Sequence, residues 1–61
     1  MFRKGQLIKI KGKVFENGNR VDGIEQIRII DFYPNLILTE RTNTKIRETF
    51  GYKELEEIRV G

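Results

Sequence analysis

Residues 5–15 (GQLIKIKGKVF) decide the fold, because their side chains alternate in character. The even positions from 8 to 14 hold isoleucine, glycine or valine, and the odd positions between them hold Lys9, Lys11 and Lys13. Successive side chains of a β-strand point to opposite faces, so this period of two predicts a long strand with one buried face. The Asn17-Gly18 pair that follows is the strongest short hairpin signal, because both residues tolerate positive φ.

A second strand is predicted over residues 24–33, where apolar residues occupy both parities. Ile27 and Ile29 lie on one parity, whereas Ile24, Ile30 and Phe32 lie on the other. Two explanations are open. The strand changes face part-way, bending from one sheet into the next, or it is buried on both sides.

Two further strands follow a tight turn. The turn covers residues 33–36 (YPNL), since proline presets φ at its second position and asparagine accepts the left-handed conformation at its third. Strands are predicted over residues 36–41 and 45–50, with a hairpin tip at 42–44. The register of this hairpin is open between two pairings: Arg41 with Lys45, or Glu40 with Arg47.

After Gly51 the apolar pattern changes from a period of two to a period of three. Tyr52, Leu55 and Ile58 recur at every third position with glutamates between them, which fits a single 3₁₀ or helical turn. A short closing strand is predicted over residues 58–60. The composition, with nine isoleucines, three valines and no alanine, favours strands over helices.

Together these elements predict an all-β fold. It is a small five-stranded SH3-like, partly open barrel with one short 3₁₀ or helical turn before the last strand, and it forms a single domain over residues 1–61. A chain of this size buries only about 60% of its surface. Without cysteine or histidine it lacks disulfides and the usual zinc ligands, so a dimer is one expectation.

The absence of histidine, cysteine and serine removes most catalytic chemistry. Thiol, Ser-His-Asp and histidine-based metal mechanisms have no residues to use, and no glycine-rich phosphate loop occurs. We therefore expect no enzyme, no cofactor and no metal site; catalysis would need a deep cleft that gathers Asp31, Glu25 or Glu48. The apolar runs are too short for a signal peptide or a membrane span, and the lack of cysteine is compatible with a cytoplasmic location.

Charge is distributed unevenly along the chain. The net charge is +3, but residues 1–13 hold five basic residues and no acid, so the remaining 48 residues sum to −2. Lys9, Lys11 and Lys13 on one strand face would lie about 6.8 Å apart, comparable to the spacing of phosphates along a nucleic-acid strand. The competing explanation is ordinary solvation of the strand and protection of a sheet edge against aggregation.

Aromatic residues beside positive charge would strengthen a nucleic-acid hypothesis, because bases stack on exposed rings. Phe15, Phe32 and Phe50 are expected in the core, which leaves Tyr33 and Tyr52 as the surface candidates. The candidate nucleic-acid-binding residues are therefore Lys9, Lys11, Lys13, Arg28, Arg47, Tyr33 and Tyr52.

An alternative function is protein–protein interaction or self-association without nucleic-acid binding. The small core and the uneven charge motivate it. Such a module would use a barrel edge, or it would set the acidic last turn, with Glu54, Glu56 and Glu57, against a basic surface.

Three segments resemble the Veg-like family of small Gram-positive bacterial proteins: residues 5–9, 32–38 (FYPNLIL) and 49–55 (TFGYKEL). That family has a basic first strand after a glycine, a tyrosine-proline turn leading into an apolar strand, and a tyrosine-containing segment before an acidic turn. The plan is also similar to that of short SH3-like proteins from these bacteria and their phages. The resemblance implies an SH3-like barrel and a cytoplasmic, non-enzymatic protein, with a regulatory role of the kind suggested for Veg in biofilm formation and spore outgrowth.

Overall fold

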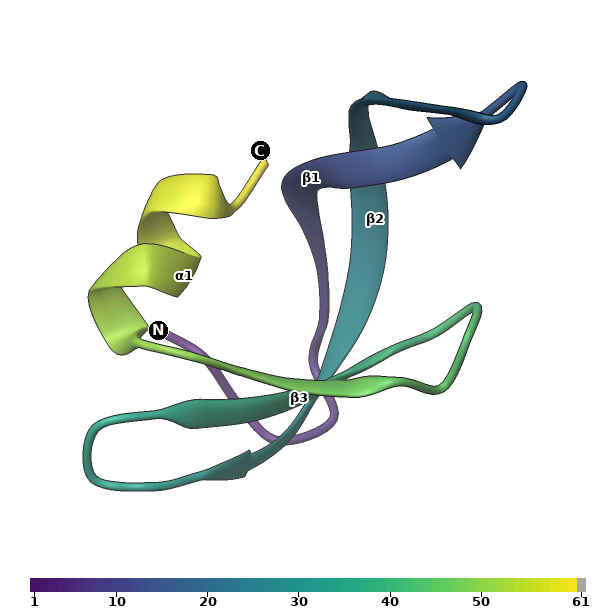
Figure 1. The fold of residues 1–61 in the computed structure, drawn as a ribbon. Helices are drawn as coiled ribbons and strands as arrows, with labels where there is room; N and C mark the ends of the chain where they lie inside the picture. The colour runs from purple at the N-terminus through teal and green to yellow at the C-terminus, as the bar shows by residue number, and fades with distance from the viewer. Residues whose placement is uncertain (61) are drawn as a thin grey trace.

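The computed structural model describes residues 1–60, without the side chains of residues 14–16. Four strands form one antiparallel sheet in the order of the sequence, and a short helix follows them (Figure 1). The elements are β1 (Leu7–Glu16), β2 (Asn19–Phe32), β3 (Ile37–Arg41), β4 (Arg47–Phe50) and α1 (Tyr52–Ile58). The predominance of strands and the four hairpin-linked strands agree with the prediction from the sequence.

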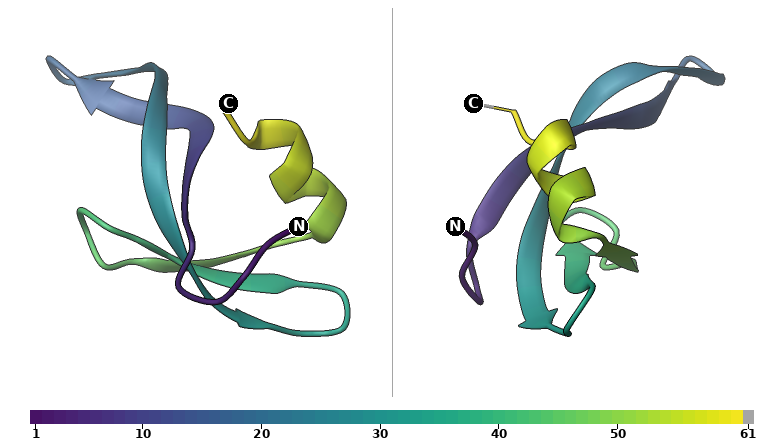
Figure 2. Two further views of the ribbon diagram at one scale, coloured as in Figure 1. Left: turned by 180° about the vertical axis from the view of Figure 1, so that it is seen from behind. Right: turned by 90° about the vertical axis from the view of Figure 1, so that its left-hand side faces the viewer.

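Strands β1 and β2 form a long hairpin that bends part-way along and projects from the rest of the molecule (Figures 1 and 2). Its turn is Asn17-Gly18, with φ angles of 54° and 81°, as the sequence predicts. Gly12 lies directly opposite Gly23 in the register. Because neither residue carries a side chain, little resists a bend at this level of the hairpin.

Strand β2 changes face at a β-bulge. Its pairing with β3 shifts between Ile29 and Asp31. Ile27 and Ile29 belong to the core before the bulge, and Phe32 packs against the same core after it. Ile24 on the other face is 58% exposed, so the strand is not buried on both sides. The predicted change of face is present, but it occurs within one continuous sheet rather than between two.

The β3–β4 hairpin adopts the second of the two registers, whose loop is one residue longer than in a pairing of Arg41 with Lys45. Glu40 pairs with Arg47, and Ile37 pairs with Phe50. This register sets two buried apolar side chains opposite each other on the core side of the sheet. Lys45 in the loop has a φ of 64°, a left-handed conformation that helps the chain reverse.

The C-terminal segment differs from the prediction. Helix α1 continues to Ile58, the first residue of the predicted closing strand. In place of a fifth strand, Arg59 forms a single antiparallel bridge with Ile10, and the Val60 N–H donates to the Lys9 carbonyl at 2.8 Å. The described residues therefore form an open sheet of four strands. Within residues 1–60 no helix is long and apolar enough to cross a membrane.

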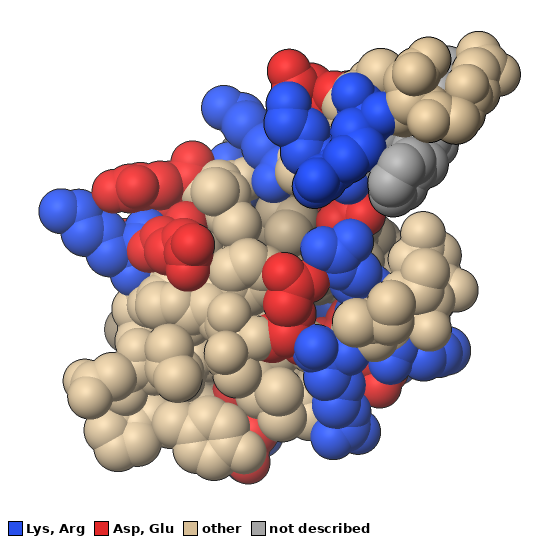
Figure 3. Space-filling model, in the orientation of Figure 1, with Lys and Arg blue, Asp and Glu red and all other residues tan. Residues whose placement is uncertain are grey.

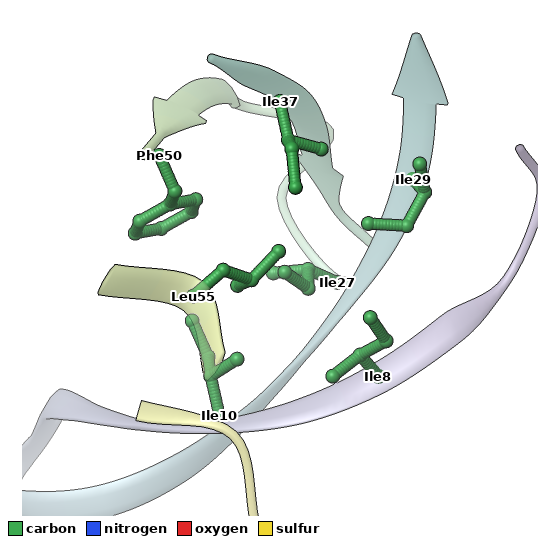
Figure 4. Packing of buried hydrophobic residues seen from close by; sticks show 7 residues of the cluster. All are labelled: Ile8, Ile10, Ile27, Ile29, Ile37, Phe50 and Leu55. Atoms are coloured by element: carbon green, nitrogen blue, oxygen red, sulfur yellow. The ribbon is translucent and has the colours of Figure 1, made fainter. Parts of the chain in front are cut away.

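The core lies between one face of the sheet and α1 (Figure 4). Its buried side chains come from all four strands and the helix: Ile8, Ile10, Ile27, Ile29, Ile37, Phe50 and Leu55. Phe50 and Phe32 contribute to this core as predicted, whereas the prediction for Phe15 concerns a side chain outside the described part of the chain. Leu55 is fully buried and closes the core from the helix side.

Candidate nucleic-acid interface

The outer face of the β1–β2 hairpin is exposed and basic. Along both strands the side chains that point away from the core alternate with the core-facing ones, and all of those described are exposed. Asp22 is the one acid among them. The five basic residues, which we call the basic face, are Lys9, Lys11, Lys13, Arg20 and Arg28. Figure 3 shows Lys and Arg side chains gathered over β1 in the upper part of the view.

Lys9 and Lys11 have no acid directly opposite them. The register pairs Lys9 with Gln26 and Lys11 with Ile24, and Arg28 is the diagonal neighbour of Lys9. Diagonal neighbours lie about 7–8 Å apart in such a ladder. Among the side chains that the structure describes, none forms an ion pair with Lys9, Lys11 or Arg28. Lys9 and Lys11 therefore form the least compensated part of the basic face, since Glu40 of β3 lies opposite Arg28 in the register.

Lys13 is paired with an acidic neighbour across the hairpin. Its ammonium group donates a hydrogen bond to the carboxylate of Asp22, which lies directly opposite. That hydrogen bond, with the positive charge of Lys13, lowers the pKa of Asp22 below its ordinary value of 3.8. Lys13 therefore has less free charge to offer a phosphate than Lys9 and Lys11 do.

Arg47 lies on the same side of the sheet but two strands away from Arg28. Glu40 of β3 lies between the two arginines in the register. The Nε atom of Arg47 donates to the Glu40 carboxylate at 3.4 Å. An acidic residue therefore separates Arg47 from the basic face.

Tyr33 and Tyr52 form a separate cluster at the other end of β2. Tyr33 is 47% exposed and Tyr52 is 39% exposed, as expected for surface residues. The Tyr52 hydroxyl donates to the Tyr33 carbonyl at 2.9 Å, and its ring stacks on Phe32 with centroids 6.3 Å apart. Tyr33, just after β2, is nine positions along the chain from Ile24, a path of up to about 30 Å. The structure therefore does not bring the tyrosines to the lysines.

Arg20 belongs to the basic face but not to the set predicted from the sequence. The signal that locates it is the hairpin register, which places Arg20 opposite residue 15. Residue 15 has the parity of the three lysines, so Arg20 falls on the same outer face. Taking Asn17-Gly18 as the turn is enough to derive this position.

The carboxylates considered for catalysis are held by basic side chains. Arg41 donates from Nη1 to Glu25 at 2.6 Å and from Nε to Glu48 at 2.8 Å. Asp31 lies apart from this cluster and pairs with Lys4 at 3.1 Å. In the part of the chain that the structure describes, no three acidic side chains converge as metal ligands would. Arg41 is not among the residues predicted from the sequence, because its spacing from Glu25 and Glu48 forms no recognisable pattern.

Comparison with protein-family models, with curated proteins and with solved structures finds no match to this chain. The class that the fold and the site define is a small antiparallel β protein with an exposed basic hairpin face.

Proposed function

We propose that this protein is a non-catalytic, cytoplasmic binding module that binds nucleic acid through the basic face. The observation that carries the proposal is the pair Lys9 and Lys11, exposed on one strand face with uncharged residues opposite both of them. Ammonium groups at this spacing match successive phosphates of a nucleic-acid strand. Arg28 and Arg20 continue the same face on β2.

The chemistry of this face favours the phosphate backbone over the bases. Its described side chains include four cations outside the Lys13–Asp22 pair, with exposed Leu7 and Ile24 between them. Base recognition on a sheet normally uses stacked aromatic rings, and Tyr33 and Tyr52 lie elsewhere. We therefore expect binding with little sequence preference.

An SH3-like barrel and a regulatory role in Gram-positive bacteria or their phages are part of the same proposal. The meandering strand order, the bent hairpin and the bridge between Arg59 and Ile10 support this arrangement, since the bridge brings the C-terminal segment to the edge of β1. The resemblance to the Veg-like family supports the regulatory role.

Fluorescence anisotropy with short single-stranded and double-stranded oligonucleotides tests the proposal. Four phosphate contacts predict that affinity falls about 10²-fold between ~50 and ~200 mM salt, because each contact releases condensed counterions. Scrambling the oligonucleotide sequence should change the affinity little. Absence of binding at the lower salt concentration would contradict the proposal.

Charge-reversal variants locate the contact. Lys9→Glu combined with Lys11→Glu should abolish binding, and Lys11→Glu alone should weaken it severalfold. Lys53→Glu is the matched control, since Lys53 is an exposed lysine on α1 and the change in net charge is the same. Equal losses in Lys11→Glu and Lys53→Glu would mean that net charge, and not the basic face, determines the affinity.

A further inference from the structure

An apolar groove lies at the end of the molecule opposite the hairpin tip. Met1, Phe2, Phe32, Tyr52 and Glu56 line it, and its volume is about 390 Å³. Its aromatic wall is held in place, because Tyr52 stacks on Phe32 and its hydroxyl is bonded to the Tyr33 carbonyl. In Figure 3 the region around the β2–β3 turn, beside this groove, carries few charged side chains.

The lining of the groove specifies the chemistry of what it would bind. Four apolar side chains face one carboxylate, Glu56, on helix α1. Glu56 is the one charged side chain among the five lining residues, and the guanidinium of Arg59, outside that lining, lies over the Phe2 ring, 5.5 Å from its centroid. A complementary surface presents an exposed apolar side chain with a cation a few ångströms away.

The chain itself offers that combination on the outer face of the β1–β2 hairpin. Ile24 is 58% exposed and lies directly opposite Lys11 in the register. The Cβ atoms of such a pair are about 5 Å apart, so an apolar knob and an ammonium group project side by side. An isoleucine side chain is small enough for the groove, and Lys11 is then within reach of Glu56.

We propose that the groove of one copy binds Ile24 and Lys11 of a second copy, so that the chain associates head to tail. This proposal does not rest on nucleic-acid binding. Because the two contacting surfaces differ, the contact is heterologous and leaves a free groove at one end and a free hairpin at the other. Association should therefore grow with concentration beyond the dimer, and salt should weaken its ionic part.

The amount of surface left exposed is consistent with such a contact. The chain exposes 4602 Å², about a tenth more than the ~4,100 Å² typical of a compact monomer of this mass. Met1, Ile24 and Tyr52, which belong to the two surfaces, are among its exposed large apolar residues.

Sedimentation velocity at low salt, from ~10 µM to ~1 mM protein, tests the proposal. The weight-average sedimentation coefficient of the unaltered chain should rise with concentration. Ile24→Thr should raise the midpoint concentration of association about tenfold, because it removes apolar side-chain atoms that the groove would bury. Glu56→Lys should cause a similar loss by placing a cation against Lys11.

Two matched controls distinguish this contact from non-specific association. Ile46→Thr removes an isoleucine that is also 58% exposed but lies in the β3–β4 loop. Glu57→Lys reverses the charge of the neighbouring helix residue, which does not line the groove. Both control variants should associate like the unaltered chain. Equal loss in a variant and its control would overturn the proposal, and so would a monomer at ~1 mM protein.

A mixture of the two defective variants gives the sharpest readout. The Ile24→Thr chain keeps its groove, and the Glu56→Lys chain keeps its hairpin, so together they should form a one-to-one dimer that grows no further. Failure to form it, with both variants folded by circular dichroism, would contradict the head-to-tail contact. Because Ile24→Thr leaves every charge of the basic face in place, its oligonucleotide binding should persist, which separates the two proposals.

Discussion

Asp31 lies in β2 immediately after the bulge, and its carboxylate has two partners. It accepts the backbone N–H of Phe32 at 2.8 Å and pairs with the ammonium group of Lys4 at 3.1 Å. A bulge disrupts the regular ladder, so a local side-chain acceptor stabilises the displaced backbone there. This role explains an acidic residue between Ile30 and Phe32, where the sequence suggests a bend or a capped acceptor.

The pKa of Asp31 should be lower than that of an unperturbed aspartate. The hydrogen bond from Phe32 lowers this pKa below its ordinary value of 3.8, and Lys4 adds to the effect. The ionised form is thus favoured in the folded state. This contribution to stability is fully present above about pH 4 and is lost as the pH falls through the folded-state pKa.

An NMR titration of the side-chain carboxyl carbons measures this directly. Lys4→Met should raise the pKa of Asp31 only part of the way, because the Phe32 hydrogen bond remains, and should leave Asp22 unchanged. Lys13→Met should do the reverse, raising the pKa of Asp22 alone. A midpoint for Asp31 at or above 3.8 in the unaltered chain would contradict the assignment.

Among the elements, β2, β3 and β4 are joined by one arginine on the core-facing side of the sheet. Arg41 of β3 holds Glu25 of β2 and Glu48 of β4. The side chain of Glu25 is only 11% exposed, and its Oε2 atom is buried without a described hydrogen-bond partner. Buried Thr39 donates from its hydroxyl to the Glu48 carbonyl at 2.9 Å and supports the same edge. These ion pairs compensate the charges that the three strands place beside the apolar core.

Removing Arg41 should therefore be costly. Arg41→Met leaves Glu25 buried without its cation, and the free energy of unfolding should fall by about 3 kcal/mol. Arg47→Met is the matched control, because it breaks an exposed pair with Glu40 and should cost below about 1 kcal/mol. Urea denaturation provides both values.

A double variant identifies the cause of that loss. Adding Glu25→Gln to Arg41→Met removes the unpaired charge, so the double variant should be more stable than Arg41→Met alone. If Arg41→Met and Arg47→Met destabilise equally, the cluster has no special role in stability.

At the scale of the whole molecule, α1 closes a core that the open sheet leaves uncovered. The molecule measures 38 × 22 × 18 Å, and the β1–β2 hairpin projects from it (Figure 2). Leu55 is the fully buried residue of the helix, and the Arg59–Ile10 bridge holds the following segment against β1. A domain of this length has a total stability of only about 3–9 kcal/mol.

Leu55→Ala tests how far the fold depends on the helix. The cavity and the lost burial should cost about 3 kcal/mol, which is close to the whole stability of a marginal domain. We expect a large fall in the free energy of unfolding, measured by urea denaturation followed by circular dichroism. Glu57→Ala on the exposed side of the helix should change the stability little. A Leu55→Ala variant as stable as Glu57→Ala would show that the helix is not needed to close the core.

The features that could be predicted from sequence are local ones. The alternation around Lys9 and Lys11 follows from the two faces of a strand, and the turn at Asn17-Gly18 from the φ angles these residues tolerate. The exposure of Tyr33 follows from its position beside the proline turn. Each depends on residues that are neighbours along the chain.

The features that could not be predicted depend on contacts between distant segments. The helix extends through Ile58 because Leu55 packs onto a sheet whose shape no local pattern specifies. Arg41 meets Glu25, 16 residues away, only after β2 and β3 pair in the observed register. The mixed parity of residues 24–33 indicates a change of face, but it does not locate the bulge between Ile29 and Asp31 where the change occurs.

The amphipathic character of β1, basic on one face, follows from its residues alone, because side-chain direction along a strand depends only on parity. Which cations share a surface depends instead on how the strands pair. Strand pairing brings Arg28 next to Lys9 in the β1–β2 hairpin and puts Glu40 between Arg28 and Arg47. Tyr52 lies in the groove at the end of the molecule opposite the hairpin tip. The physical reason is that strand pairing and helix packing are set by the burial of the common core, whose members lie far apart along the chain.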